Sequence, residues 1–141
     1  MRNLLPLLIV TLLCGLLAAP VYADAPPQEQ EAVVARVDSD GVQRATIVGG
    51  AYFFKPRHLV VKANLPVELS LSREAGIVPH TLVIKVPEAG IVLDQVLGTE
   101  VSKVGFTPTA AGTYPYYCRN KLLFFKSHRE QGMEGMLEVV P

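Results

Sequence analysis

The chain has 141 residues, half of them hydrophobic, and its 13 lysines and arginines balance 13 aspartates and glutamates. A chain without excess positive charge lacks the basic surface that nucleic-acid binding requires, so we expect no nucleic-acid partner. Its length is that of a single domain rather than several.

The N-terminal residues 1–23 have the features of a secretory signal peptide. Arg2 precedes an apolar block at residues 4–19, and Val21 and Ala23 occupy the positions where small residues direct cleavage. The block is short for a membrane-spanning helix and is interrupted by a proline. We therefore predict cleavage after Ala23 and a folded part that is periplasmic or secreted. The alternative is an uncleaved N-terminal anchor that tethers the protein to the membrane.

Residues 24–30 are polar and proline-rich, which predicts a flexible leader. Beyond them no segment has a helical period, and short runs of β-branched and aromatic residues alternate with Gly, Pro, Asn and Asp. This pattern is typical of an all-β protein, and we predict one Greek-key sandwich or barrel of about eight strands over residues 31–141. The runs cover residues 33–37, 42–48, 52–54, 59–63, 67–72, 80–86, 101–107, 113–118 and 136–140.

Three connections between these runs are predicted to differ in structure. Asp38-Ser39-Asp40-Gly41 predicts a hairpin turn, because an Asp-Gly pair tolerates positive φ. Residues 88–100 are too irregular for a strand assignment. Residues 119–132 are expected to form a loop or a short helical turn.

Two residues with metal-binding side chains point toward the predicted core. The two-residue period of a strand puts His80 on a face with three apolar residues and Cys118 on a face with two tyrosines. Cys14 leaves with the signal peptide, so Cys118 has no partner for an internal disulfide in an oxidising compartment. His128 and Met133 follow in the connection to the last strand. Taken alone, an inward histidine or a buried cysteine is more often an ordinary core residue.

Together these side chains supply the donors of an electron-transfer copper site, which uses a thiolate, two imidazoles and a weak axial thioether. Soft sulfur favours Cu(I), and imidazole also accepts Cu(II). A rigid scaffold that holds both states in one geometry lowers the reorganisation needed when an electron moves. A bound metal also explains the lone cysteine, because a buried thiolate without a partner is strongly destabilising.

From about residue 46 to residue 141 the sequence resembles the cupredoxins, the superfamily of plastocyanin and azurin. The matching motifs are Pro79-His80 with the strand that follows, the strand at 112–118 that leads into the cysteine, and the segment 128–139 with Gly132 before the methionine. The resemblance implies a mononuclear type 1 site for one copper ion, with equatorial ligands His80, Cys118 and His128 and axial ligand Met133.

Two departures from the family pattern concern the loop after the cysteine. Nine residues separate Cys118 from His128, more than in familiar members, which leaves the geometry and the potential of the site open. Thr81 follows the first histidine where many members have Asn, so the hydrogen bond that braces the cysteine loop must come from a hydroxyl or be lost. Met136 is the alternative axial donor, although its place at the start of the last strand favours a packing role.

The surroundings of the site suggest a partner. Leu122, Leu123, Phe124 and Phe125 are either core filling or a hydrophobic rim where a redox partner protein docks near His128. Lys121, Lys126 and Arg129 are either a solvated fringe or a basic ring that steers an acidic partner. His58 is expected at the surface. We expect a monomer with no membrane span once the signal is cleaved.

The resemblance implies a one-electron carrier between redox partners. The alternative is a copper-handling protein for buffering, delivery or resistance, which the long ligand loop favours, although Met-rich and His-rich tracts are missing. We expect no enzyme. Copper oxidases and nitrite reductases need further histidines, a dinuclear centre needs a second cysteine, and no Ser-His-Asp set remains.

Overall fold

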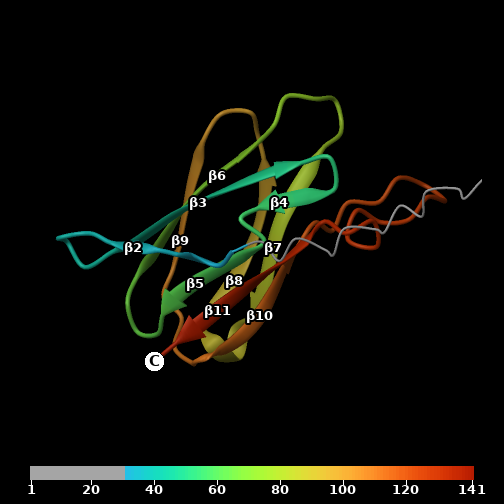
Figure 1. The fold of residues 1–141 in the computed structure, drawn as a ribbon. Coiled ribbons are helices and arrows are strands. Elements are labelled where there is room, and N and C mark those ends of the chain that lie inside the picture. Colours follow the sequence, from blue (N-terminus) through green and yellow to red (C-terminus); the bar gives the residue numbers. More distant parts are fainter. Residues whose placement is uncertain (1–30) are drawn as a thin grey trace, which may run out of the picture.

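A computed structural model describes residues 31–141, which form two β-sheets around a shared core (Figure 1). The predicted signal peptide and leader, residues 1–30, lie outside the described residues. The strands are β1 (Val33–Val34), β2 (Arg36–Val37), β3 (Gln43–Gly50), β4 (Phe53–Lys55), β5 (His58–Lys62), β6 (Val67–Arg73), β7 (His80–Val86), β8 (Ile91–Leu97), β9 (Ser102–Phe106), β10 (Gly112–Tyr117) and β11 (Glu134–Val140).

The larger sheet has the strand order β1-β5-β11-β10-β7-β8, and the smaller has the order β2-β3-β6-β9 with β4 paired to β3. Most neighbours are antiparallel, whereas the pairs β1–β5, β5–β11 and β3–β6 are parallel. The all-β two-sheet prediction is therefore confirmed. Between residues 31 and 141 the one helical segment is a 3₁₀ turn at Pro87–Ala89, and no helix there is long and apolar enough to cross a lipid bilayer.

The predicted hairpin turn joins β2 to β3. Gly41 has φ +79°, and its N–H donates to the Asp38 carbonyl at 2.9 Å. Arg44 on β3 reaches back to both aspartates of the turn, and this guanidinium lowers the pKa of Asp40 to about 2. The Asp-Gly prediction is confirmed, and ion pairs within the hairpin support the turn.

The expected strand at residues 33–37 is two strands in two different sheets. β1 pairs with β5 in the larger sheet, and β2 pairs with β3 in the smaller one. Ala35 lies between them, buried, with its N–H donating to the Val60 carbonyl at 2.9 Å. The chain crosses from one sheet to the other at this residue, and a methyl group is small enough to pass beside the core.

β8 is a strand in the segment that the sequence pattern left unassigned. It lies at the edge of the larger sheet, next to β7. Ile91 and Leu97 face the core, but Val92 and Val96 are exposed on the other face. Because apolar residues occupy both faces, the alternation that marks a half-buried strand is missing from the sequence.

The core lies between the sheets and follows the two-residue period of their strands. Along β6, for example, Val67, Leu69 and Leu71 are buried and alternate with more exposed residues. Tyr116 contacts Phe54 edge to face, with ring centroids 5.5 Å apart. The largest fully buried side chains are Tyr116, Phe54, Ile47, Leu59, Leu69, Leu71, Leu82, Ile84, Ile91, Leu97, Met133 and Leu137. Cys118 and Met133 belong to this core, so two of the predicted metal donors are part of the packed interior.

Candidate metal centre

Three connections lie at the end of the molecule where the predicted ligands are found. They are the turn between β3 and β4, the connection between β6 and β7, and the long connection between β10 and β11 (Figure 1). His80 begins β7, Cys118 follows β10 directly, and His128 lies in the long connection. That connection contains turns and no helix from residue 119 to residue 132, so the loop prediction is confirmed.

The structure brings His80, Cys118 and His128 together. Their donor atoms lie within 4.8 Å of one another, and all three residues are buried. The Nδ1 atoms of the two histidines are 3.2 Å apart, and Cys118 Sγ is 3.4 Å from His128 Nδ1. Cys118 is fully inaccessible to solvent. Two imidazoles and one thiol therefore converge on one point although the histidines are 48 positions apart in the chain.

Burial keeps both imidazoles neutral. Desolvation lowers the pKa of His80 and of His128, and for His80 the charges of His128 and Arg73 lower it further. A neutral imidazole has a free lone pair on one ring nitrogen, and a protonated one has none. At neutral pH both rings are therefore in the form that binds a metal ion.

Thr81 connects the first histidine to the cysteine loop. Its backbone N–H donates to Cys118 Sγ at 3.3 Å, and its hydroxyl lies 3.7 Å from the same sulfur. The hydroxyl also accepts the Arg119 N–H at 3.1 Å and donates to Asn120 Oδ1 at 2.9 Å. The first of the two alternatives is confirmed, since a threonine hydroxyl braces the loop.

Asn120 is a contributor that the sequence analysis did not identify. Its Oδ1 lies 3.3 Å from Cys118 Sγ, and its backbone carbonyl accepts the His128 N–H at 2.9 Å. One residue thus contacts the sulfur and fixes the backbone of the second histidine. The only sequence signal was its place two residues after the cysteine, which does not show that the chain turns back toward the sulfur.

Met133 is tied to two of the three clustered residues through the backbone. Its N–H donates to the His128 carbonyl at 2.9 Å, and its carbonyl accepts the Cys118 N–H at 3.1 Å. The side chain is fully buried, while axial ligation by its sulfur stays a prediction. Met136 is 44% exposed, because β11 directs Leu137 and Val139 inward and Met136 outward. The alternative axial donor therefore neither faces the cluster nor fills the core.

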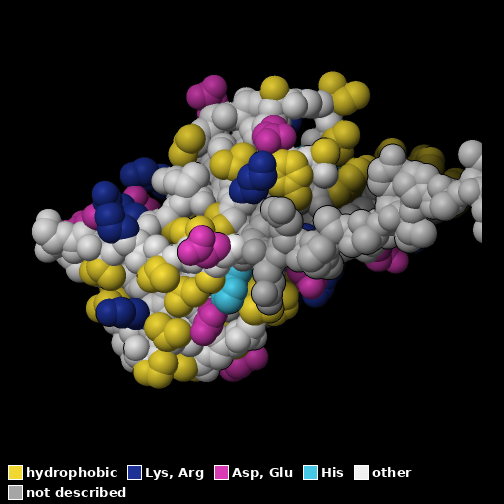
Figure 2. All heavy atoms as spheres, viewed as in Figure 1, with side chains coloured by type: hydrophobic (Ala, Val, Ile, Leu, Met, Phe, Trp, Pro, Cys, Tyr) yellow, Lys and Arg dark blue, Asp and Glu magenta, His cyan; other side chains and the backbone are white. Residues whose placement is uncertain are grey.

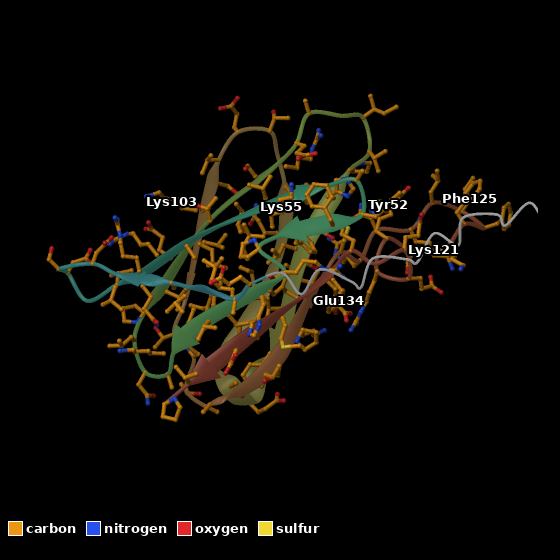
Figure 3. The ribbon with its side chains drawn as sticks, in the orientation of Figure 1. Tyr52, Lys55, Lys103, Lys121, Phe125 and Glu134 are labelled. Carbon is orange, nitrogen blue, oxygen red and sulfur yellow. The ribbon has the colours of Figure 1, made fainter. Side chains whose placement is uncertain are left out.

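An apolar hollow adjoins the second histidine. The ring of Tyr52 meets the His128 ring edge to face at 5.1 Å, and Figure 3 shows Tyr52 at the same end as Lys121 and Phe125. The hollow has a volume of about 680 Å³ and is lined by Tyr52, Ile77, Val78, Pro79, Asn120, Lys121, Leu122, Phe125, Lys126, His128 and Gln131. Residues 122–125 are all exposed, so the core-filling interpretation is wrong. Leu122 and Phe125 line the hollow, and docking of a redox partner on these residues stays a prediction.

Some of the charged residues near the site form ion pairs within the domain, and others do not. Arg129 pairs with Glu134 and lies over the Tyr117 ring at 4.2 Å, so it is held against the domain. Lys121 and Lys126 form no ion pair within residues 31–141. His58 is partly exposed, and its Nε2 lies 2.8 Å from Glu138. The third histidine is not part of the cluster.

The two mixed sheets, with the donor cluster at one end, have the cupredoxin fold. The metal-binding domain of the Cu(I)-exporting P-type ATPase CopA of Streptococcus pneumoniae D39 is similar, with a TM-score of 0.58, 20% identity, and coverage of 79% of this chain and 98% of that chain. Auracyanin B is similar with a TM-score of 0.56, 23% identity and coverage of 76% and 94%. The auracyanin of Roseiflexus castenholzii has a TM-score of 0.55, 17% identity and coverage of 70% and 97%. No protein-family model and no curated protein sequence matches the chain.

Proposed function

We propose that the chain is an exported, mononuclear copper protein of type 1 that carries single electrons between redox partners. His80, Cys118 and His128 would hold one copper ion, with Met133 as the axial donor. The convergence of a buried thiol and two neutral imidazoles carries this proposal. Copper bound there supplies a one-electron change between Cu(I) and Cu(II), and no substrate is transformed.

The donor set fits copper better than the other common metals. A single sulfur with two imidazoles suits Cu(I) and Cu(II), whereas structural zinc sites are closed by four cysteine or histidine ligands. Among residues 31–141 no further His, Cys, Asp or Glu joins the cluster. A three-donor set with a buried thioether nearby therefore matches the demand of an electron-transfer copper ion.

The residues around the donors favour a rigid site. The Thr81 N–H donates to the sulfur, and backbone hydrogen bonds join Met133 to both Cys118 and His128. A site held by hydrogen bonds on several sides changes little when its charge changes. Fast one-electron exchange requires this property, and it supports a carrier over a protein that must release its ion.

The metal site is tested by its colour. The exported protein with one equivalent of Cu(II) is expected to show intense visible absorption from thiolate-to-copper charge transfer, measured by absorption spectroscopy. Cys118→Ser should abolish the absorption. The matched control is His58→Gln, which removes the one histidine outside the cluster and should keep the colour. A colourless wild-type protein, or a coloured Cys118→Ser protein, would contradict the copper site.

Copper handling is the second candidate function. The long, exposed loop between Cys118 and His128 favours it, and so does the likeness to the metal-binding domain of a Cu(I)-exporting ATPase. A delivery protein must release its ion, whereas a carrier must retain it. We expect fast electron self-exchange, measured by NMR line broadening in mixtures of the two redox states, and slow Cu(I) loss to a chelator. Slow self-exchange with rapid loss would favour delivery.

The proposed carrier meets its partner beside His128. The ring of this histidine lines the apolar hollow, whose rim includes Leu122 and Phe125. An imidazole that lies between the cluster and this hollow gives an electron a short route through bonds. We also propose that the protein acts as a monomer in the periplasm or outside the cell.

A further inference from the structure

The connection between β10 and β11 has an apolar tip that the metal centre does not use. Residues 122–125 are Leu, Leu, Phe and Phe, and Phe124 is 99% exposed. The tip is a defined turn, in which the Phe125 N–H donates to the Leu122 carbonyl at 2.9 Å. Four consecutive exposed apolar side chains are unusual on a protein surface and indicate an interaction site.

The connection between β6 and β7 adds apolar surface at the same end. Ile77 is 99% exposed, and Val78 is also exposed. Both residues line the hollow together with Leu122 and Phe125. In Figure 1 both connections extend beyond the sheets, and in Figure 2 hydrophobic atoms mark the end where the β6–β7 connection lies. Exposed apolar residues of two loops therefore flank the hollow.

Two lysines stand at the margins of this tip. Lys121 and Lys126 flank the apolar run, both are exposed, and neither forms an ion pair in the part of the chain that the structure describes. The acidic group near them is Glu130, whose carboxylate accepts the Ser127 hydroxyl at 2.6 Å and the Ser127 N–H at 2.7 Å. Exposed apolar side chains flanked by lysines are complementary to a partner that has an apolar interior and negatively charged groups at its boundary.

We propose that the tip at residues 121–126, together with Ile77, docks the domain on an anionic lipid bilayer. The apolar side chains enter the interfacial region, and Lys121 and Lys126 contact lipid phosphates. Lipids rearrange around a protruding tip, whereas a protein partner would need a recess of matching shape for a side chain as exposed as Phe124. Docking brings the hollow and His128 to the membrane surface. This inference goes beyond the proposed electron transfer and does not depend on it.

The chain contains no tryptophan, so a single introduced tryptophan reports its own surroundings. The test uses Phe124→Trp in the exported, metal-free protein with phosphatidylcholine vesicles that contain or lack phosphatidylglycerol. The matched control is Val92→Trp, at an exposed position on β8. We expect a blue shift of Phe124→Trp emission with anionic vesicles, together with quenching by brominated lipid. Emission of Val92→Trp should not change when the tip binds the vesicle, because β8 lies outside the tip and this tryptophan stays in water.

The lysines are tested in the Phe124→Trp background. Lys121→Gln with Lys126→Gln should weaken binding to anionic vesicles roughly tenfold or more, because each lysine near an anionic surface contributes attraction. The control pair Lys62→Gln with Lys85→Gln removes the same charge from exposed positions on β5 and β7 and should leave binding unchanged. Phe124→Trp emission that stays water-like with anionic vesicles overturns the proposal and leaves the tip to a protein partner. If both double variants weaken vesicle binding equally, the proposed contacts of Lys121 and Lys126 with lipid phosphates are overturned.

Discussion

Thr81 anchors the cysteine loop to the strand that carries the first histidine. Its hydroxyl accepts the Arg119 N–H and donates to Asn120, while its backbone N–H donates to the sulfur of Cys118. The side chain is almost fully buried, so water cannot replace these hydrogen bonds. Thr81 and Asn120 together connect two segments that lie 39 residues apart.

Replacing Thr81 by Val tests this connection, because valine keeps the shape and removes the hydroxyl. The Arg119 N–H then loses its acceptor, and we expect the free energy of unfolding of the metal-free protein to fall by about 1–3 kcal/mol. The backbone N–H to the sulfur remains, so the visible absorption should persist with a shifted maximum. Thr113→Val, at an exposed position on β10, is the control in urea unfolding. Equal stability of the two variants would show that the hydroxyl does not brace the loop.

Among the strands, β10 and β11 depend on a close approach between a glycine and an aromatic ring. Gly135 on β11 lies opposite Tyr116 on β10, and a Cβ on this glycine would come within 2.2 Å of the Tyr116 ring. The tyrosine hydroxyl donates to the Pro56 carbonyl at 2.6 Å, so the ring is held at its far end. Cys118 follows this strand, and displacement of the ring would therefore move the sulfur.

Gly135→Ala is expected to lower the free energy of unfolding by about 1–3 kcal/mol, because the added methyl group overpacks a fixed ring. It should also weaken the visible absorption of the copper-loaded protein. Gly105→Ala on β9 is the matched control, since a Cβ there meets its nearest atom at an ordinary 3.5 Å. Urea unfolding measures the free energy of unfolding of both variants. If Gly135→Ala is as stable as Gly105→Ala, the close approach of Gly135 to the Tyr116 ring is contradicted.

For the whole molecule, two buried neutral histidines link folding to pH. The pKa of His80 and of His128 lies below the ordinary value because burial disfavours the charged ring. Below about pH 6.5 the unfolded chain therefore binds more protons than the folded protein does, and the free energy of unfolding falls as the pH falls. Above that pH both states hold neutral rings, and this dependence vanishes.

We expect the melting temperature of the metal-free protein to be level above about pH 6.5 and to decrease between about pH 6.5 and 5, before most carboxylates titrate. Scanning calorimetry at several pH values measures this slope. The double variant His80→Gln with His128→Gln cannot gain these protons and should have a flatter profile. A slope that is unchanged in the double variant would assign the pH dependence to other groups.

The sequence alone determined the local features. The two-residue period predicted most strands, the Asp-Gly pair predicted the hairpin, and the cupredoxin-like motifs pointed to His80, Cys118 and His128 as neighbours. The strand period and the turn depend on interactions between near neighbours in the chain, through steric limits on φ and the alternation of side chains along a strand. For the same reason β8 was missed, since its exposed valines hide the alternation.

Only the tertiary structure decided what depends on distant segments. It brought His80 within reach of His128, turned Met136 outward, and placed Asn120 beside the sulfur. It also separated β1 from β2 and left residues 122–125 exposed. Burial and side-chain contact depend on which segments pack together, and a run such as Leu-Leu-Phe-Phe is equally compatible with a core and a protruding tip until the two sheets are assembled.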